Sequence, residues 1–216
     1  AAPEGVILIE DNKPDAVALM EEKVAPYENI RVVAAKTQYP EGAEKMLIKK
    51  VMGRQVPSGK LPADVGCVVS NTSTAKAISD AIQKGMPLVE RAVSVTGDFI
   101  RNPGNYMVKL GTNVQELIDH CGGITGDDVV LKMGGPMMGA PLKDTNVPII
   151  KGSNGVIAIA ADHTEEKEGI KGGRCVDVCP MELQPLEIYK YGQLGDAEKL
   201  LTLNVMDCFS CKCCEY

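Results

Sequence analysis

The sequence has no tryptophan, two phenylalanines and two histidines among its 216 residues. His120 and His163 are too few and too isolated for a catalytic triad, and we expect each to be a surface or helix-end residue. No apolar run approaches the roughly 20 residues that cross a bilayer; the longest in the C-terminal third is Val156–Ala161. We also expect no secretory signal, because no basic segment followed by an apolar one opens the chain. These absences favour a reducing, cytoplasmic setting.

Positive charge does not predominate. The net charge is −6, which argues against nucleic acid as a partner because such binding needs clustered lysine and arginine. Apolar residues make up 44% and charged residues 24%, an ordinary globular composition. The length suits one or two compact domains with a small appendage.

The first part of the chain, 1–88, alternates strand and helix signals and is predicted to be an α/β segment. Proline and glycine mark its helix ends: Pro14 lies in the first turn of one helix, and Gly53 and Gly85 end two others. The expected strands are Gly5–Ile9 and Ile30–Ala35, and the expected helices run from Asn12 or Lys13 to Val24, from Gly42 to Met52 and from Thr72 to Lys84.

Residues 89–161 have a different pattern, with short strands around a single helix. Thr112 and Gln115 resemble a capping box for a helix that ends at Cys121, before two glycines. Gly134–Pro141 is expected to be a loop with packing methionines. The expected strands are 93–97, 106–108, 129–132 and 156–159, and together these elements predict a small β-grasp-like domain.

The cysteines carry the strongest signal. Cys208, Cys211 and Cys214 form a C-x₂-C-x₂-C run, and Cys175 and Cys179 form C-x₃-C followed by proline. These are the two halves of the bacterial ferredoxin pattern, in which one loop supplies three thiolates and the other motif supplies the fourth. We therefore predict one [4Fe–4S] cluster held by Cys179, Cys208, Cys211 and Cys214.

A second cluster would need cysteines at 169 and 172 beside Cys175, and a further one after the last residue. Gly169 and Gly172 occupy those positions, and the sequence ends at Tyr216. Cys175 is therefore interpreted as the remnant of a second cluster site.

Other uses of the cysteines remain open. A structural zinc could take two cysteine pairs, although the triplet and the Cys-Pro favour iron; disulfides are disfavoured in a reducing compartment. Cys67 and Cys121 are isolated and are expected to be buried small apolar side chains. The spacing gives Cys213 no place on the cluster.

A family resemblance extends over nearly the whole sequence. Four N-terminal segments, 39–47, 56–59, 61–66 and 69–74, resemble the C subunit of the Rnf electron transport complex and, more distantly, the NADH-binding flavoprotein subunit of respiratory complex I. Val95–Gly97, Asn102–Gly104 and the pair Gly122-Gly123 resemble the SLBB β-grasp domain of that family, and the cysteine region resembles its ferredoxin domain.

The resemblance implies three parts: a partial α/β flavin- and NADH-binding domain (1–88), an SLBB β-grasp domain (89–161), and a partial, small α-helical 4Fe-4S ferredoxin-like domain (162–216). By position, Tyr39, Glu44, Asn71 and Thr74 match residues that line the flavin and nicotinamide region. Glu44 could equally be a helix-surface carboxylate, and Asn71 could be a helix N-cap.

The implied function is electron transfer within a multisubunit ferredoxin:NAD oxidoreductase that is also an ion translocase. Electrons would pass between FMN, NAD(H) and iron–sulfur clusters, with integral membrane and redox subunits, ferredoxin and NAD(H) as partners. The chain would be peripheral, on the cytoplasmic side of the membrane.

Two departures from the family qualify this expectation. The glycine-rich flavin loop of the family does not precede the first strand, so we expect this sequence to be truncated at both ends and to bind FMN poorly. The other departure is the glycine pair at 169 and 172. Two alternative functions stay open: a cobalamin-reducing flavoprotein of a metabolic microcompartment, and a non-enzymatic docking module with a structural metal.

Overall fold

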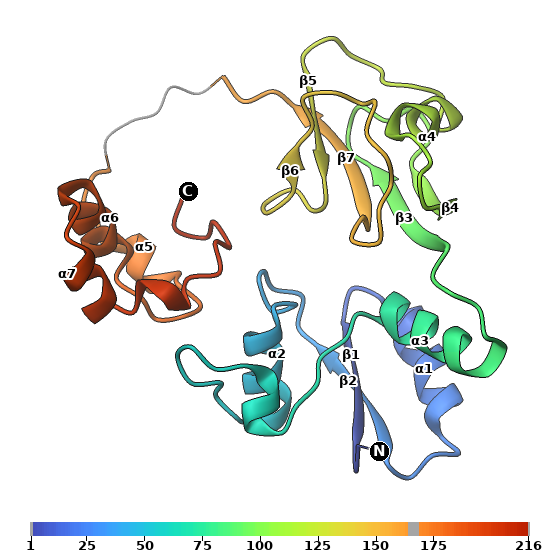
Figure 1. Ribbon diagram of the computed structural model, residues 1–216, viewed down its shortest axis with the longest axis horizontal. Helices are drawn as coiled ribbons and strands as arrows, with labels where there is room; N and C mark the ends of the chain where they lie inside the picture. The colour runs from blue at the N-terminus through green and yellow to red at the C-terminus, as the bar shows by residue number, and fades with distance from the viewer. Residues whose placement is uncertain (1, 164–168, 216) are drawn as a thin grey trace. The chain divides into compact units, whose positions relative to one another are not determined.

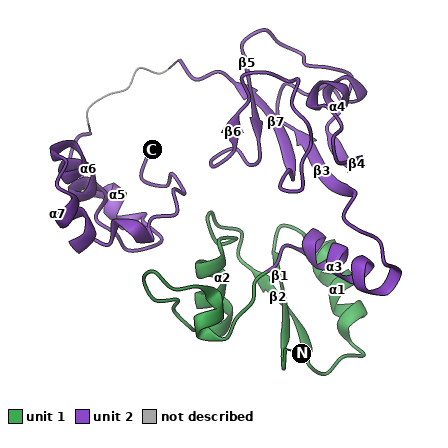
Figure 2. Cartoon of the chain, in the orientation of Figure 1, with its two compact units in different colours: residues 1–69 green, residues 70–216 purple. Residues whose placement is uncertain are grey.

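The computed structural model describes residues 2–163 and 169–215. The chain divides into two compact units, Ala1–Val69 and Ser70–Tyr216, which Figure 2 shows in different colours. Each unit is described by itself below. Among the described residues, no helix combines the length and the apolar character that crossing a membrane requires.

The first unit begins with a strand–helix–strand motif, β1 (Gly5–Glu10), α1 (Pro14–Val24) and β2 (Ile30–Ala35) (Figure 1). β1 and β2 pair in parallel, from Gly5 opposite Ile30 to Glu10 opposite Ala35. The helix packs against β2. Parallel neighbours require a crossover connection, and α1 provides it. The structure confirms both predicted strands, with β1 one residue longer than expected, and the helix begins at Pro14 with Lys13, one of the two predicted openings, as its N-cap.

Two further helices follow this motif, separated by a short 3-10 turn, η1 (Pro62–Val65). α2 covers Glu44–Met52, two residues shorter than expected because Ala43 is extended and serves as its N-cap. α3 covers Thr72–Lys84 as predicted and is assigned to the second unit. Gly53 and Gly85 both end their helices with a φ of 63°, the left-handed conformation in which glycine has no steric penalty.

A five-stranded sheet forms the centre of the second unit. Its order is β4-β3-β7-β5-β6, and only the β3–β7 pair is parallel. β6 was missed from the sequence, because two residues inside the expected 134–141 loop are too few to show a period-two pattern. The strands are β3 (Glu90–Thr96), β4 (Gly104–Lys109), β5 (Val129–Met133), β6 (Ala140–Pro141) and β7 (Gly155–Ala160).

α4 (Val114–His120) covers one face of this sheet, and its residues Val114, Leu117 and Ile118 join strand residues in one apolar core. The helix and mixed sheet form the β-grasp arrangement expected for this region. The capping-box prediction at Thr112 was wrong by one residue. Asn113 is the N-cap, because its Oδ1 atom accepts a hydrogen bond from the Gln115 backbone N–H at 2.9 Å.

The C-terminal part consists of short helices: α5 (Arg174–Asp177), α6 (Pro185–Leu194), α7 (Ala197–Thr202) and the 3-10 turn η2 (Val205–Asp207). α6 contacts α5 and α7, and α7 contacts η2. The expected polar linker at 164–168 lies outside the described residues. Of residues 169–215, only Leu183 and Cys211 are buried.

Candidate functional site

After Cys179 the backbone forms a turn that directs an amide N–H group toward the sulfur of Cys179. Cys179 follows α5, and the Glu182 N–H donates to its carbonyl oxygen at 3.0 Å. Glu182 has a φ of 56°, which is uncommon for a residue with a side chain. The next residue, Leu183, then donates its N–H to Cys179 Sγ at 3.4 Å. This turn supplies an amide donor to a sulfur that is predicted to be a ligand.

In the loop of Cys208, Cys211 and Cys214, a backbone N–H group again donates to a cysteine sulfur. Ser210 and Lys212 both have positive φ values, 56° and 67°. Each costs about 1–2 kcal/mol for a residue with a Cβ atom. The Ser210 N–H donates to Cys208 Sγ at 3.4 Å. Two strained residues in one short loop are the kind of feature that accumulates at functional sites.

The two cysteine motifs are electrostatic neighbours. Burial raises the pKa of Cys214, and electrostatic interaction with Cys208, Cys211 and Cys179 raises this pKa further, against a backbone hydrogen bond that lowers it. Burial also raises the pKa of Cys213 to about 11, together with a hydrogen bond to Cys211. Cys179 is distant in sequence from the triplet, so tertiary folding brings its sulfur close to the others.

The donor set has the chemistry of a thiolate-bound cluster. Cys211 is 8% exposed, Cys208 and Cys214 are exposed, and Cys179 is intermediate. Within residues 2–163 and 169–215, however, no three histidine, cysteine or acidic side chains converge closely enough to hold a metal ion as they stand. Sulfur donors and amide N–H groups at the sulfurs both fit an iron–sulfur cluster.

The remaining cysteines behave in three ways. Cys175 lies in α5 and is half-buried. Cys121 is fully buried in the sheet core, as predicted. Cys67 was expected to be buried but is only half-buried, since its sulfur contacts the polar Val65 carbonyl oxygen at 3.7 Å rather than an apolar core.

The glycine pair at 169 and 172 leaves space for larger side chains. A Cβ atom at Gly169 would meet nothing within 4 Å, and one at Gly172 would lie 3.5 Å from the Ile170 side chain, an ordinary contact. Neither glycine has a positive φ. The absence of cysteine at these positions is therefore not dictated by the backbone.

The four residues matched to the flavin region lie in different units. Tyr39 and Glu44 belong to the first unit: Tyr39 is 46% exposed, and Glu44 is exposed in the first turn of α2. Asn71 and Thr74 belong to the second unit, at the start of α3. Asn71 is an N-cap, because its Oδ1 atom accepts from the Ser73 N–H at 3.0 Å. This bond uses only the oxygen of the Asn71 amide.

Two family models match this chain. The Nuo51 FMN-binding domain matches residues 1–80, and the SLBB domain matches residues 92–141. Among curated proteins, the chain is 44% identical over 188 residues to the C subunit of the proton-translocating ferredoxin:NAD(+) oxidoreductase complex of Clostridium ljungdahlii, covering 86% of this chain and 41% of that protein. The chain is therefore similar to part of this C subunit.

Two further relatives of this C-subunit family support the same conclusion. The C subunit of the Na(+)-translocating ferredoxin:NAD(+) oxidoreductase complex of Acetobacterium woodii is 39% identical over 206 residues, covering 94% of this chain and 46% of the relative. The C subunit of the ion-translocating oxidoreductase complex of Rhodobacter capsulatus is 42% identical over 205 residues, covering 93% and 39%. The chain therefore spans less than half the length of these three relatives.

The family matches correspond to the observed elements. The FMN-binding match covers the β1–α1–β2 motif, α2 and the first part of α3. The SLBB match begins within β3 and extends to the end of β6, and β7 completes the same sheet beyond the matched range.

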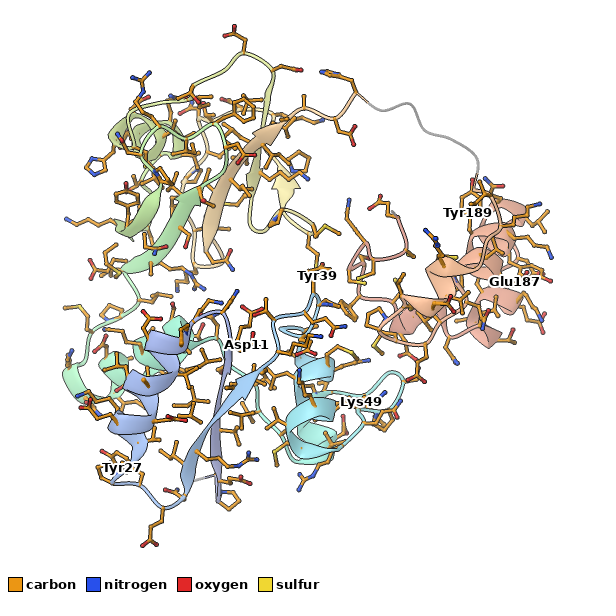
Figure 3. All side chains as sticks on the ribbon, turned by 180° about the vertical axis from the view of Figure 1, so that it is seen from behind. Asp11, Tyr27, Tyr39, Lys49, Glu187 and Tyr189 are labelled. Carbon is orange, nitrogen blue, oxygen red and sulfur yellow. The ribbon has the colours of Figure 1, made fainter. Side chains whose placement is uncertain are left out.

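Sequence reasoning missed a polar contact within the FMN-binding match. Asp11 follows β1 and Thr37 follows β2; Asp11 Oδ1 accepts from the Thr37 N–H at 2.9 Å and from its hydroxyl at 2.7 Å. These hydrogen bonds lower the pKa of Asp11. Figure 3 labels Asp11 and also Tyr39, which follows two residues after Thr37. An acidic residue at the carboxyl end of a parallel strand was the available signal, since α/β sheets bind ligands at that edge.

Proposed function

We propose that this chain is part of the electron-transfer subunit of a membrane-associated ferredoxin:NAD oxidoreductase of the Rnf type. In this proposal, electrons pass between flavin or NAD(H) and iron–sulfur clusters, and membrane partners couple the transfer to ion transport. The activities for which the Clostridium ljungdahlii and Acetobacterium woodii relatives are named support it. The structural observation that carries it is the proximity of the Cys179 thiol to those of the Cys208–Cys214 loop.

The proposed ligands of one [4Fe–4S] cluster are Cys179, Cys208, Cys211 and Cys214. When bound, such a cluster accepts and donates single electrons. The four thiolates would hold the iron atoms, and the Leu183 and Ser210 N–H groups would offset the negative charge on two of the sulfurs. Cys175 is proposed as the remnant of a second site.

The proposed division of the chain follows its expected boundaries: a partial flavin- and NADH-binding domain at 1–88, the SLBB domain at 89–161 and a partial ferredoxin-like domain at 162–216. In the first, Tyr39, Glu44, Asn71 and Thr74 are proposed to line the FMN and NAD(H) region. The exposed position of Tyr39 and Glu44 supports this assignment, because both side chains are accessible to a ligand.

The proposed location is the cytoplasmic side of the membrane, through integral and redox subunits of the same complex, with ferredoxin and NAD(H) as redox partners. The names of the relatives, each a subunit of a translocating complex, support membrane partners.

Anaerobic reconstitution with ferrous iron and sulfide tests the central claim. We expect about four irons per chain and the charge-transfer absorption of a [4Fe–4S] centre. Cys179→Ser should abolish most of the iron uptake, whereas Cys67→Ser, at a cysteine outside the proposed ligand set, should leave it unchanged. Binding of zinc in place of iron, or an unaltered cluster in Cys179→Ser, would contradict the assignment.

A further inference from the structure

The loop between β2 and α2, residues 36–43, carries Tyr39, one of the residues proposed to line the FMN and NAD(H) region. The centre of this loop is a turn in which the Glu41 N–H donates to the Gln38 carbonyl oxygen at 2.9 Å. Tyr39 lies inside the turn. The position of its side chain therefore depends on how the two ends of the turn are attached to the rest of the first unit.

The C-terminal end of the turn is attached to α2. The Ala43 N–H donates to the Pro40 carbonyl oxygen at 2.9 Å, and the Leu47 N–H donates to the Ala43 carbonyl oxygen at 2.9 Å. The Lys50 ammonium, inside the helix, also forms an ion pair with the Glu41 carboxylate. This end of the loop is therefore continuous with the first turn of the helix.

The N-terminal end of the turn is attached to β1 through Asp11. The Asp11 N–H donates to the Ala35 carbonyl oxygen at 2.7 Å, and its Oδ1 atom accepts from the Thr37 hydroxyl at 2.7 Å and from the Thr37 N–H at 2.9 Å. These bonds to Thr37 lower the pKa of Asp11, so the carboxylate is ionised at neutral pH. Hydrogen bonds to an ionised acceptor are stronger than those between neutral groups. Asp11 and Tyr39 both lie beyond the carboxyl ends of the paired strands (Figure 3).

We propose that Asp11 is a positioning residue that holds the 36–43 loop, and with it Tyr39, in place and thereby raises the affinity of the chain for NAD(H). This inference rests on the proposed function, which assigns Tyr39 to the NAD(H) region. Residues 36–39 are all exposed, so burial contributes little to the order of this end of the loop. A loop that is ordered before binding loses less conformational freedom when the ligand binds. Asp11 has this effect without touching the nucleotide.

The test uses the whole 216-residue chain with NADH as the ligand. Asp11→Ala removes the acceptor, Asp11→Asn keeps a carbonyl oxygen in its place, and Asp15→Ala removes another exposed carboxylate, in the first turn of α1, as the matched control. Amide hydrogen exchange of residues 36–43 measures the order of the loop, and titration calorimetry measures the affinity for NADH.

We expect Asp11→Ala to accelerate exchange across the loop while β1 and β2 stay protected. It should also weaken NADH binding by roughly two- to tenfold, which corresponds to ordering one freed side chain on binding. Asp11→Asn should restore part of both quantities, and Asp15→Ala should match wild type.

Tyr39→Ala tests whether Asp11 acts through the loop. When Asp11→Ala is added to Tyr39→Ala, exchange of the loop should still accelerate, but the affinity for NADH should fall no further. A further loss as large as the one in the wild-type background would show that Asp11 contacts the nucleotide itself, and would overturn the positioning role.

The remaining outcomes separate this inference from the proposed function. Unchanged exchange of the loop in Asp11→Ala, or faster exchange with the wild-type affinity for NADH, would overturn the role of Asp11 and leave the assignment of Tyr39 intact. A wild-type chain that binds no NADH, although its loop depends on Asp11 for order, would instead contradict the nucleotide-binding role proposed for this domain, and the effect of Asp11 on affinity with it.

Discussion

The SLBB sheet and the C-terminal cysteine segment are held together in different ways. Twelve buried side chains form one apolar core in the sheet domain, whereas among the described residues 169–215 only Leu183 and Cys211 are buried. Large apolar side chains of the C-terminal segment, such as Leu194 and Leu201, are 69% and 64% exposed. The sheet domain can therefore be stabilised by apolar burial alone, and the C-terminal segment cannot.

This difference shows that cysteine has two physical roles in one chain. Cys121 is a core side chain in the sheet, while the cysteines of the C-terminal segment lie near one another where that segment has no apolar core. Segments of fewer than about 40 to 50 residues commonly need a metal or disulfides to fold. When a metal site is absent from the unfolded chain, the free energy of metal binding contributes directly to folding.

Removing the iron should produce the largest difference in stability between the C-terminal segment and the sheet domain. In the reconstituted protein, chelation should abolish amide hydrogen-exchange protection in α6 and α7, because too little apolar surface is buried there to hold them. Protection in β3, β5 and β7 should stay unchanged. Hydrogen-exchange mass spectrometry of the two states measures both regions at once.

Cys211→Ser is the matched variant, because it should reproduce the loss in α6 and α7 without chelator. Full protection of α6 in the metal-free chain would show that the segment folds without a cluster, and the comparison would fail.

Gly97→Ala should instead destabilise the sheet domain and leave iron binding unchanged. Gly97 has a φ of 112°, and a Cβ atom there would lie 2.0 Å from the Ala158 carbonyl oxygen. The backbones of β3 and β7 must separate, so we expect the free energy of unfolding of this domain to fall by about 3 kcal/mol. Urea unfolding followed by exchange protection of β7 measures the loss.

Gly123→Ala is the control for Gly97→Ala, since Gly123 has a φ of 85° but no atom within 4 Å of an added Cβ. It should cost about 1–2 kcal/mol, from backbone strain alone. Iron content should be unchanged in both variants; equal losses of stability would show that close packing at Gly97 is unimportant.

Two helix caps, one in each region, test the comparison between the sheet domain and the C-terminal segment with an effect of intermediate size. Asn113 caps α4, and Asp196 caps α7 by accepting from the Lys199 N–H at 2.9 Å. Each change to alanine should cost about 1 kcal/mol of local stability in the iron-loaded protein. In the metal-free protein only Asn113→Ala should retain its effect, because α7 is then already unfolded. Hydrogen-exchange protection near each cap, measured with and without iron, gives the change in local stability for both variants in both states. A destabilising effect of Asp196→Ala that persists without iron would contradict the expectation.

The smallest effect concerns the cysteine of the sheet core. A hydrogen bond to Cys121 raises the pKa of Tyr106, and burial adds to the shift. The folded state thus holds this proton more tightly than the unfolded chain, so the contact stabilises the fold below pH about 10 and is lost as pH rises through the folded pKa. Cys121→Ala should lower the pKa of Tyr106 toward its ordinary value, as measured by ultraviolet titration. An unchanged titration would show that the thiol does not contact the phenol.

Much of the local structure was predictable, because its causes lie within a few residues. Pro14, Gly53 and Gly85 set helix ends through their own backbone preferences, and the structure places each as expected. The N-cap of α4 was assigned one residue early, since Thr112 and Asn113 can both cap and only the observed backbone, extended at Asn113, selects between them. The Asp11–Thr37 contact depends on the parallel pairing of two strands, which no local pattern contains.

The sequence by itself determined the order of elements, the resemblance to the C subunit of the Rnf complex and the cysteine spacing from which the ligand set is proposed, because each is a property of residue type and separation along the chain. Only the tertiary structure decided that the Cys179 thiol lies near the Cys208–Cys214 loop and that Cys67 is half-buried. Those features depend on how distant segments pack and on left-handed turns at Glu182, Ser210 and Lys212. Spacing gives the number of thiols available, and folding gives each thiol its neighbours.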